Sequence, residues 1–266
     1  MRYLLSLVAF CAWFSSVAQE KKPLIIGERI ELESTVLNEK RTINIYLPPS
    51  YGKQENKKYA VIYLLDGSMD EDFVHIAGLV QFANFPWIQM IPESIVVGIA
   101  NIDRRRDFTY PTSIKKDKET FPTTGGSASF ISFIENELQP HINQHYLTND
   151  TTTLIGQSLG GLLATEILYK KPDLFSNYII ISPSLWWDDE SLLELEFHAK
   201  NKRVFVAVGK EGAYMEGSAI KLGRVLESRQ KTHQIRSSFH YLESQDHANI
   251  LHLAVYKAFE EAKKIK

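Results

Sequence analysis

The chain has 266 residues, and 44% of them are apolar, which suits one large α/β domain or two small domains with a buried core. The formal net charge is −2, so the composition gives no electrostatic reason to expect nucleic acid or an anionic membrane surface as a partner. Function must therefore be sought in local groups of residues.

Residues 1–18 have the pattern of a cleaved signal peptide. Arg2 supplies a positive charge, residues 4–14 form an apolar run, and the small residues Ser-Val-Ala follow at 16–18. The run is shorter than the roughly 20 apolar residues of a transmembrane helix, although a retained N-terminal anchor is the alternative. We expect export to the periplasm or the medium, with a mature chain that begins near Gln19 and contains no integral membrane segment.

The cysteine content narrows the chemistry. Cys11 is the only cysteine in the sequence, and it lies within the signal segment behind a phenylalanine too bulky for a lipoprotein cleavage site. The mature chain would therefore have no thiol, which excludes disulfides, a cysteine nucleophile and a zinc–thiolate site.

After residue 20 the sequence alternates between β-rich and helical patterns. An antiparallel pair is expected at 25–36 and 41–47, turning around Asn38, and a continuously apolar strand at 59–65. Further strands are expected at 94–100, 152–155, 178–181, 204–208 and 238–242. Helical patterns lie at 127–146, 159–170, 219–229 and 248–264.

Strands that alternate with helices predict an α/β fold with a mainly parallel central sheet, an antiparallel N-terminal edge and helices on both faces. We expect residues 19–266 to form one such domain. Ligands of these folds bind beyond the carboxyl ends of the strands, so functional residues are expected there.

The segment Gly156-Gln157-Ser158-Leu159-Gly160 stands between an expected strand and an expected helix. In that context G-x-S-x-G forms a nucleophile elbow, in which a strained turn projects the serine Oγ. The amide of Leu159 and the N-terminus of the helix would face an oxyanion. A chance match in a glycine-rich turn is the alternative, and the strand–helix context favours Ser158 as the nucleophile.

The candidate base is His247. α/β-Hydrolases with this elbow have the chain order serine, acid, histidine, and the histidine follows the last strand. His247 lies in the loop after the strand at 238–242, whereas His240 lies within that strand and His252 within the last helix.

The candidate acid is Glu211, in the loop after the strand at 204–208. Its carboxylate would accept the Nδ1–H of the histidine and fix the tautomer. Glu216 on the same loop and Asp246 beside the histidine are alternatives, and a solvated loop carboxylate is the functionless interpretation of Glu211.

A second oxyanion donor is expected from the loop after an early central strand. Asp66-Gly67-Ser68 follows the strand at 59–65, which makes the backbone amide of Ser68 or Met69 the candidate. An ordinary Asp-Gly turn is the alternative.

Six motifs occur in order: Tyr63-Leu64-Leu65-Asp66-Gly67, Arg104-Arg105-Arg106-Asp107-Phe108-Thr109, Gly125-Gly126, Gly156-Gln157-Ser158-Leu159-Gly160-Gly161, Ser182-Pro183-Ser184 with Trp186-Trp187, and Asp246-His247. This set resembles the putative esterase family of α/β-hydrolases, over almost all of the mature chain. That family includes ferric-siderophore (enterobactin and salmochelin) esterases and is akin to feruloyl and acetyl-xylan esterases. The resemblance implies Ser158 as nucleophile, His247 as base and the arginine-rich stretch as a substrate-facing loop.

Two features depart from the family pattern. The loop after Gly209 contains no aspartate, and the resemblance to periplasmic siderophore hydrolases implies a weak or displaced acid, so that replacing Glu211 would cost less than replacing a well-oriented triad acid. Tyr110 separates Thr109 from Pro111, where relatives place the proline directly.

Arg104, Arg105 and Arg106 are candidates for substrate binding, because guanidinium groups stack on aromatic rings and bind anionic oxygens. The neighbouring Asp103 and Asp107 can pair with only some of them. A solvated basic turn is the alternative interpretation.

Trp186 and Trp187 follow the strand at 178–181 and are further candidates for substrate binding. They would either wall an aromatic-ester pocket or pack their loop onto the core.

Together these features predict a serine hydrolase that cleaves small-molecule carboxylic esters, siderophore-type esters among them, through an acyl-enzyme. No cofactor is expected, and no ligand-spaced cluster such as H-E-x-x-H predicts a metal site. The alternatives are a carbohydrate-ester (feruloyl or acetyl) esterase and a non-catalytic binding protein on the same fold. The acyl group, the alcohol and the oligomeric state do not follow from the sequence.

Overall fold

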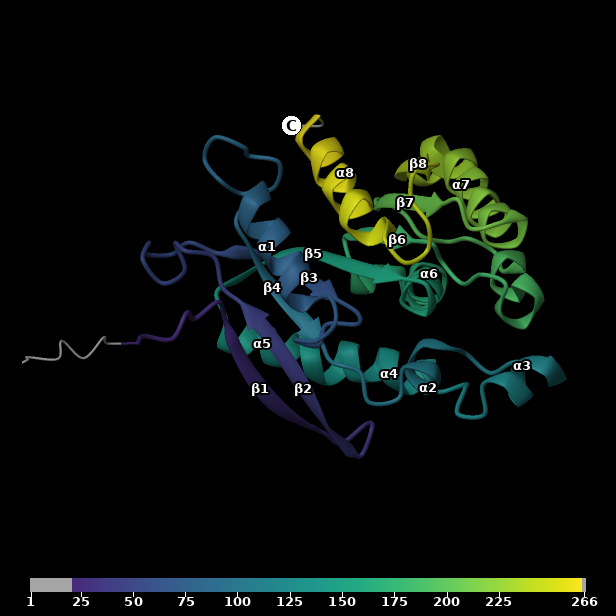
Figure 1. Cartoon of the computed structure of the whole chain (residues 1–266), viewed down its shortest axis with the longest axis horizontal. Coiled ribbons are helices and arrows are strands. Elements are labelled where there is room, and N and C mark those ends of the chain that lie inside the picture. The colour runs from purple at the N-terminus through teal and green to yellow at the C-terminus, as the bar shows by residue number, and fades with distance from the viewer. Residues whose placement is uncertain (1–20, 265–266) are drawn as a thin grey trace, which may run out of the picture.

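The computed structural model describes residues 21–264, so the signal peptide predicted for residues 1–18 lies outside the described residues. Within them an eight-stranded sheet has the order β1-β2-β4-β3-β5-β6-β7-β8 (Figure 1). β1 (Glu28–Ser34) pairs antiparallel with β2 (Glu39–Tyr46), and β2 pairs antiparallel with β4 (Ser94–Ile99). All the other pairs are parallel. The prediction of a mainly parallel sheet with an antiparallel N-terminal edge is confirmed.

The remaining strands are β3 (Tyr59–Leu64), β5 (Thr148–Gln157), β6 (Asn177–Ile181), β7 (Arg203–Gly209) and β8 (Arg236–Leu242). The helices are α1 (Phe73–Ala83), α2 (Arg104–Phe108), α3 (Lys115–Thr120), α4 (Ser127–Phe133), α5 (Gln139–His145), α6 (Leu159–Lys170), α7 (Ala213–His233) and α8 (Ile250–Lys264). A π-helical turn (Ile134–Leu138) joins α4 to α5, and 3-10 turns lie at Pro172–Leu174 and Trp187–Glu194.

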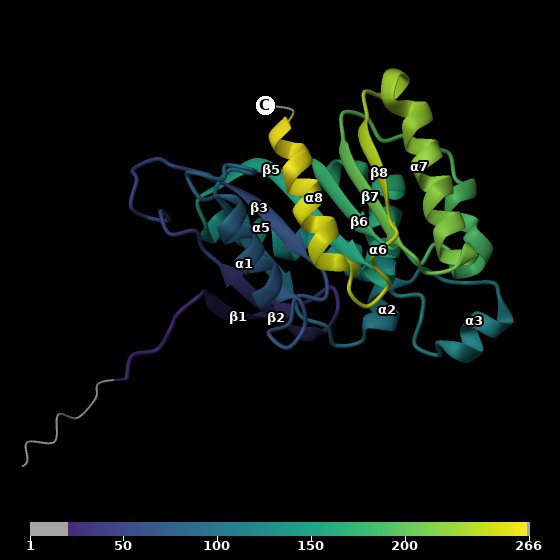
Figure 2. The ribbon, with the colours of Figure 1, turned by 45° about the horizontal axis from the view of Figure 1, so that its top comes forward.

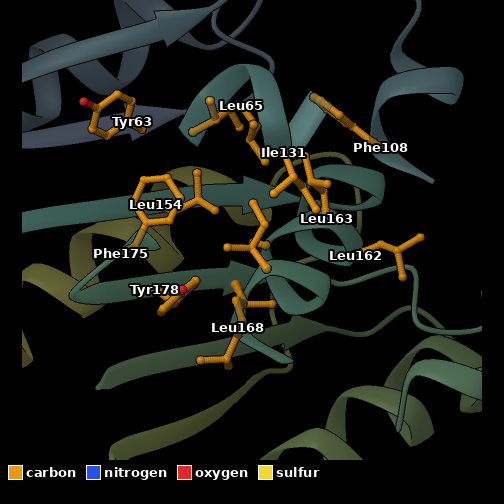
Figure 3. Close-up of a cluster of buried hydrophobic side chains, with 14 of the residues drawn as sticks. Tyr63, Leu65, Phe108, Ile131, Leu154, Leu162, Leu163, Leu168, Phe175 and Tyr178 are labelled. Atoms are coloured by element: carbon orange, nitrogen blue, oxygen red, sulfur yellow. The ribbon is translucent and has the colours of Figure 1, made fainter. Parts of the chain in front are cut away.

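Helices cover both faces of the sheet, and each face has its own hydrophobic core. Successive side chains of β3 point to opposite faces of the sheet and so belong to different cores. Tyr63 belongs to the core beneath α4, α6 and α7, whereas Leu64 belongs to the core beneath α1 and α8. Figure 3 shows part of the first core, where Leu168 of α6 lies near Tyr178 of β6 and Leu163 of α6 lies near Ile131 of α4. Burial on both faces explains why β3 is continuously apolar.

Several elements differ from the expectations. α1 and α3 were not predicted, and a π-helical turn divides the helix expected at 127–146. Arg104–Phe108 forms a short helix rather than a loop, because the side chain of Asp103 accepts a hydrogen bond from the amide of Arg106 and caps it. Among residues 21–264 no helix combines the length and the apolar character that crossing a bilayer requires.

Candidate active site

Ser158 stands in a strained turn at the carboxyl end of β5, directly before α6. Its φ of 60° and ψ of −121° are unfavourable for a residue with a Cβ, and its amide donates to the carbonyl of Ile181 over 3.0 Å. Glycine is required beside it, because a Cβ on Gly156 would lie 2.3 Å from the carbonyl oxygen of Gly160. The turn therefore has the form of a nucleophile elbow.

His247 joins this serine to a carboxylate. In the loop after β8, its Nε2 lies 3.0 Å from Ser158 Oγ, and its Nδ1 lies 2.6 Å from Oε2 of Glu211. The side chain of Gln157 donates to the carbonyl oxygen of His247 over 2.5 Å, which ties the loop to the elbow. Three residues that are far apart in the sequence thus form one chain of hydrogen bonds.

Glu211 is held firmly in the loop after β7. Its side chain is only 2% exposed, and its Oε1 accepts the amide of Gly209 over 2.9 Å and the hydroxyl of Ser182. Burial alone would raise the pKa of this carboxyl, but the hydrogen bonds from His247, Ser182 and Gly209 outweigh it and hold the pKa below its ordinary value. Glu211 therefore stays ionised at neutral pH and can orient the imidazole.

The alternative acids have other partners. Glu216 accepts the amides of Glu211 and Gly212, each over 2.8 Å, and so fixes the loop that carries Glu211. Asp246 accepts the amides of Ala248 and Asn249 at the start of α8. The expectation of a displaced acid is not met by this geometry, because Glu211 contacts the histidine directly.

The oxyanion donors expected from the sequence are the backbone amides of Leu159 and of Ser68 or Met69. Leu159 is the first residue of α6, so its amide has no acceptor within the helix. The amide of Ser68 makes a long contact of 3.3 Å with Oε2 of Glu71, and that of Met69 has no hydrogen-bond acceptor in the described chain. Of the two amides in this loop, that of Met69 is therefore the one without an acceptor among the described residues.

The three arginines differ in what they bind. Arg104 forms a two-pronged ion pair with Asp66, at 2.6 and 3.0 Å, and also reaches the carbonyl of Gln157, so it ties the loop after β3 to the elbow. Arg106 pairs with Asp107 and Glu39, each at 2.7 Å. Arg105 is exposed and forms no ion pair within residues 21–264, and its guanidinium lies 4.9 Å from the ring centre of Phe121.

Trp186 and Trp187 differ in burial. Trp187 is fully buried and donates its Nε1–H to the carbonyl of Tyr110 over 2.8 Å, so the prediction that it contacts substrate is wrong. Its ring packs in the core, as large aromatic side chains commonly do. Trp186 is partly exposed, and its ring lies 6.0 Å from that of Phe121.

An open cavity of about 580 Å³ lies beside Ser158, His247 and Glu211. Its lining consists of Ser158, Ser184, Trp186, Lys210, Glu211, Met215, Asp246, His247 and Ala248. The sequence reasoning missed Lys210, Met215 and the role of Ser182, which donates to Glu211 from a backbone with φ of 43°. The Ser182-Pro183-Ser184 motif was the signal that could have found Ser182 and Ser184.

Three comparisons place the chain among known proteins. A protein-family model described as "Putative esterase" matches residues 34–252. Ferri-bacillibactin esterase BesA of Bacillus subtilis (strain 168) is 30% identical over 262 residues, which cover 90% of this chain and 90% of that protein. An IroE-like serine hydrolase from Shewanella oneidensis has a TM-score of 0.80 at 30% identity, covering 90% of this chain and 80% of its own. The BES protein from Bacillus cereus has a TM-score of 0.79 at 28% identity, covering 92% and 98%.

Proposed function

The chain belongs to the putative esterase family of α/β-hydrolases and is a carboxylic ester hydrolase, and we propose that it cleaves siderophore-type esters through an acyl-enzyme on Ser158. The observation that carries the mechanism is the chain of hydrogen bonds from Ser158 through His247 to Glu211 at an open cavity. The observation that favours the substrate class is the similarity to BesA, a ferri-bacillibactin esterase.

Ser158, His247 and Glu211 have separate roles in the proposed reaction. His247 Nε2 takes the proton of Ser158 Oγ as that oxygen attacks the ester carbonyl, and Glu211 accepts the Nδ1–H of the imidazolium. The amide of Leu159, with that of Ser68 or Met69, stabilises the oxyanion. The ester C–O bond then breaks, His247 returns the proton to the leaving alcohol, and a water activated by the same histidine hydrolyses the acyl-enzyme.

Side chains beside the cavity favour an anionic aromatic substrate. Trp186 lines the cavity, and Phe121 lies between it and the exposed guanidinium of Arg105. Lys210 also lines the cavity, and its ammonium group forms no ion pair within the described chain. Aromatic faces with unpaired cations beside them fit a negatively charged aromatic ester.

Fluorophosphonate labelling tests the mechanism. The wild type and Ser184→Ala should be labelled, because Ser184 Oγ lies 3.4 Å from Ser158 Oγ but does not contact the histidine. Ser158→Ala should not be labelled. An unlabelled wild type would favour the binding-protein alternative, and labelling of Ser158→Ala would show that a residue other than Ser158 is the nucleophile.

A substrate panel tests the class. Trilactone siderophores, feruloyl sugars, acetylated xylan and short p-nitrophenyl esters are compared by kcat/KM. The proposal requires the highest value for a trilactone, whereas a preference for feruloyl sugars or acetylated xylan would replace it with the carbohydrate-ester alternative.

The site of action is a separate proposal. The pattern of residues 1–18 supports export and cleavage near Gln19. N-terminal sequencing of periplasmic or secreted protein should find that start, and material beginning at Met1 would contradict it.

A further inference from the structure

An apolar cavity lies at the end of the sheet opposite Ser158. It has a volume of about 130 Å³ and is bounded by the first residues of the central strands and by α8, which crosses this face of the sheet (Figure 2). Ile62, Ile179 and Phe205 line it from the strands, and Ala258, Phe259 and Ala262 line it from α8. A cavity of about 150 Å³ lined by Leu, Ile and Phe holds a benzene molecule. This cavity is of nearly that size and mostly apolar, with Thr151, Thr153 and Asn177 also in its lining, so it fits an apolar group of similar size.

A cationic side chain stands at the mouth of this cavity. Arg203, the first residue of β7, lines both the cavity and an adjoining pocket of about 470 Å³ that extends past β8. The residue is partly buried, yet its guanidinium forms no ion pair and no hydrogen bond within residues 21–264. Arg104 and Arg106, in contrast, are both paired with carboxylates. A partly exposed guanidinium that has no carboxylate partner beside an apolar cavity can bind an anionic group.

The surroundings strengthen the positive charge. Arg236 is the register partner of Arg203 on β8, and its side chain is also unpaired in the described chain. Glu261 is the acidic residue of the adjoining pocket, but its oxygens accept hydrogen bonds from Ser238 over 2.5 Å and bind His240 over 2.6 Å. This carboxylate is therefore not directed to Arg203.

We propose that this end of the molecule is a second binding site, for a small monocarboxylate with an apolar body. The body occupies the cavity between the strands and α8, and the carboxylate binds the guanidinium of Arg203 with two parallel hydrogen bonds. No histidine is among the described residues that line the cavity, so we expect binding without hydrolysis. The inference does not depend on the substrate proposed for Ser158.

Isothermal titration calorimetry with benzoate and its neutral isostere benzamide tests the site. Benzoate should bind the wild type at least about tenfold more tightly than benzamide, because only the acid makes a charge-assisted hydrogen bond. Arg203→Gln should weaken benzoate binding by roughly tenfold to a hundredfold and remove the preference.

Two further variants locate the binding. Ala258→Leu should prevent binding by filling the cavity, and Arg224→Gln should leave it unchanged, because Arg224 is an exposed and unpaired arginine on α7. Circular dichroism checks that each variant is folded. Equal binding of benzoate and benzamide, no binding at millimolar ligand, or loss of affinity in Lys210→Gln rather than Arg203→Gln would overturn the proposal. The last result would show that benzoate binds in the cavity beside Ser158.

Discussion

The loops after β7 and β3 emerge at the same edge of the sheet, and each holds a carboxyl group that is shielded from solvent to some degree. Glu211 lies in the first loop and Asp72 in the second. Burial raises the pKa of both groups, yet the pKa of Glu211 ends below its ordinary value, whereas that of Asp72 is raised to about 6. The difference must come from their neighbours.

Glu211 is surrounded by hydrogen-bond donors: the imidazole of His247, the hydroxyl of Ser182 and the amide of Gly209. Asp72 instead lies near two other carboxylates, Asp66 and Glu71, and makes no side-chain capping bond to α1. Arg104 acts in the opposite direction on Asp72, but it is paired with Asp66. Burial raises the pKa in both loops, but the neighbouring groups keep Glu211 ionised and make ionisation of Asp72 unfavourable.

The largest expected effect is at the serine that both loops border. Ser158→Ala should reduce kcat by about 10⁶-fold, the loss typical of a removed nucleophile. Ester hydrolysis is measured under single-turnover and steady-state conditions, with Ser184→Ala as the matched variant. Substantial turnover by Ser158→Ala would show that Ser158 is not the nucleophile and that Glu211 is not the acid of a catalytic triad.

Glu211→Gln tests whether the ionised carboxylate of Glu211 contributes to catalysis. The amide keeps the shape but cannot stabilise the imidazolium, so kcat should fall by about 10⁴-fold. Because the pKa of Glu211 lies below its ordinary value of 4.5, protonation of this group should not limit wild-type activity above that pH. The pH profile of kcat checks this point.

The matched variant is Glu216→Gln, which alters a side chain of the same loop that bonds to amides and not to His247. Its loss should be far smaller than that of Glu211→Gln. If the two losses were alike, Glu211 would act only by shaping the loop. A negligible effect of both would support the weak or displaced acid that the family resemblance implies.

Much of this site followed from the sequence because its signals are local. The elbow glycines follow a predicted strand that ends in Leu154 and Ile155, and β5 continues to Gln157 directly before the serine, so the pattern of strand, turn and helix could be recognised from neighbouring residues. α1 also carries a helical stripe, Phe73, Ile76, Ala77 and Val80, so the sequence does contain a local signal for this helix.

Other features could not be found locally. Trp186 and Trp187 are adjacent in sequence, and only the packing of Phe121 and Tyr110 decides which one faces the cavity. Likewise, the pairing of Arg104 with Asp66 and of Arg106 with Glu39 joins residues that lie 38 and 67 positions apart. Nothing in the run of three arginines distinguishes Arg105 before the chain is folded.

Arg105→Gln tests the role of the arginine that no carboxylate neutralises. KM for an anionic aromatic ester should rise by about tenfold to a hundredfold through loss of a charged contact. KM for a neutral short-chain ester should stay unchanged, and so should the thermal stability. Arg106→Gln is the contrast: it should lower stability because it breaks the pairs with Asp107 and Glu39. Equal KM changes for both esters in Arg105→Gln would show that this residue does not recognise substrate.

The smallest expected effect concerns Asp72. Its pKa in the folded chain, about 6, lies above the ordinary value of 3.8. The unfolded chain therefore releases this proton first as the pH rises, which favours unfolding. The neutral carboxyl costs nothing below pH 3.8, the cost grows between 3.8 and 6, and it is complete above pH 6. Solvent screening at this partly exposed group limits the cost to about 1 kcal/mol.

Asp72→Asn removes the charge while keeping a side chain that suits a helix N-terminus. Its melting temperature at pH 7.5 should exceed that of the wild type by about 2–4 °C, and most of the gain should vanish near pH 4, where Asp72 of the folded wild type is neutral. Asp70→Asn is the matched control, since Asp70 is an exposed carboxylate of the same loop and should give no such gain. A destabilised Asp72→Asn at pH 7.5 would mean that the charge on Asp72 helps to hold α1, as a carboxylate at a helix N-terminus commonly does. The two loops would then share one electrostatic design, with Arg104 supplying to Asp66 and Asp72 what the donors around Glu211 supply in the other loop.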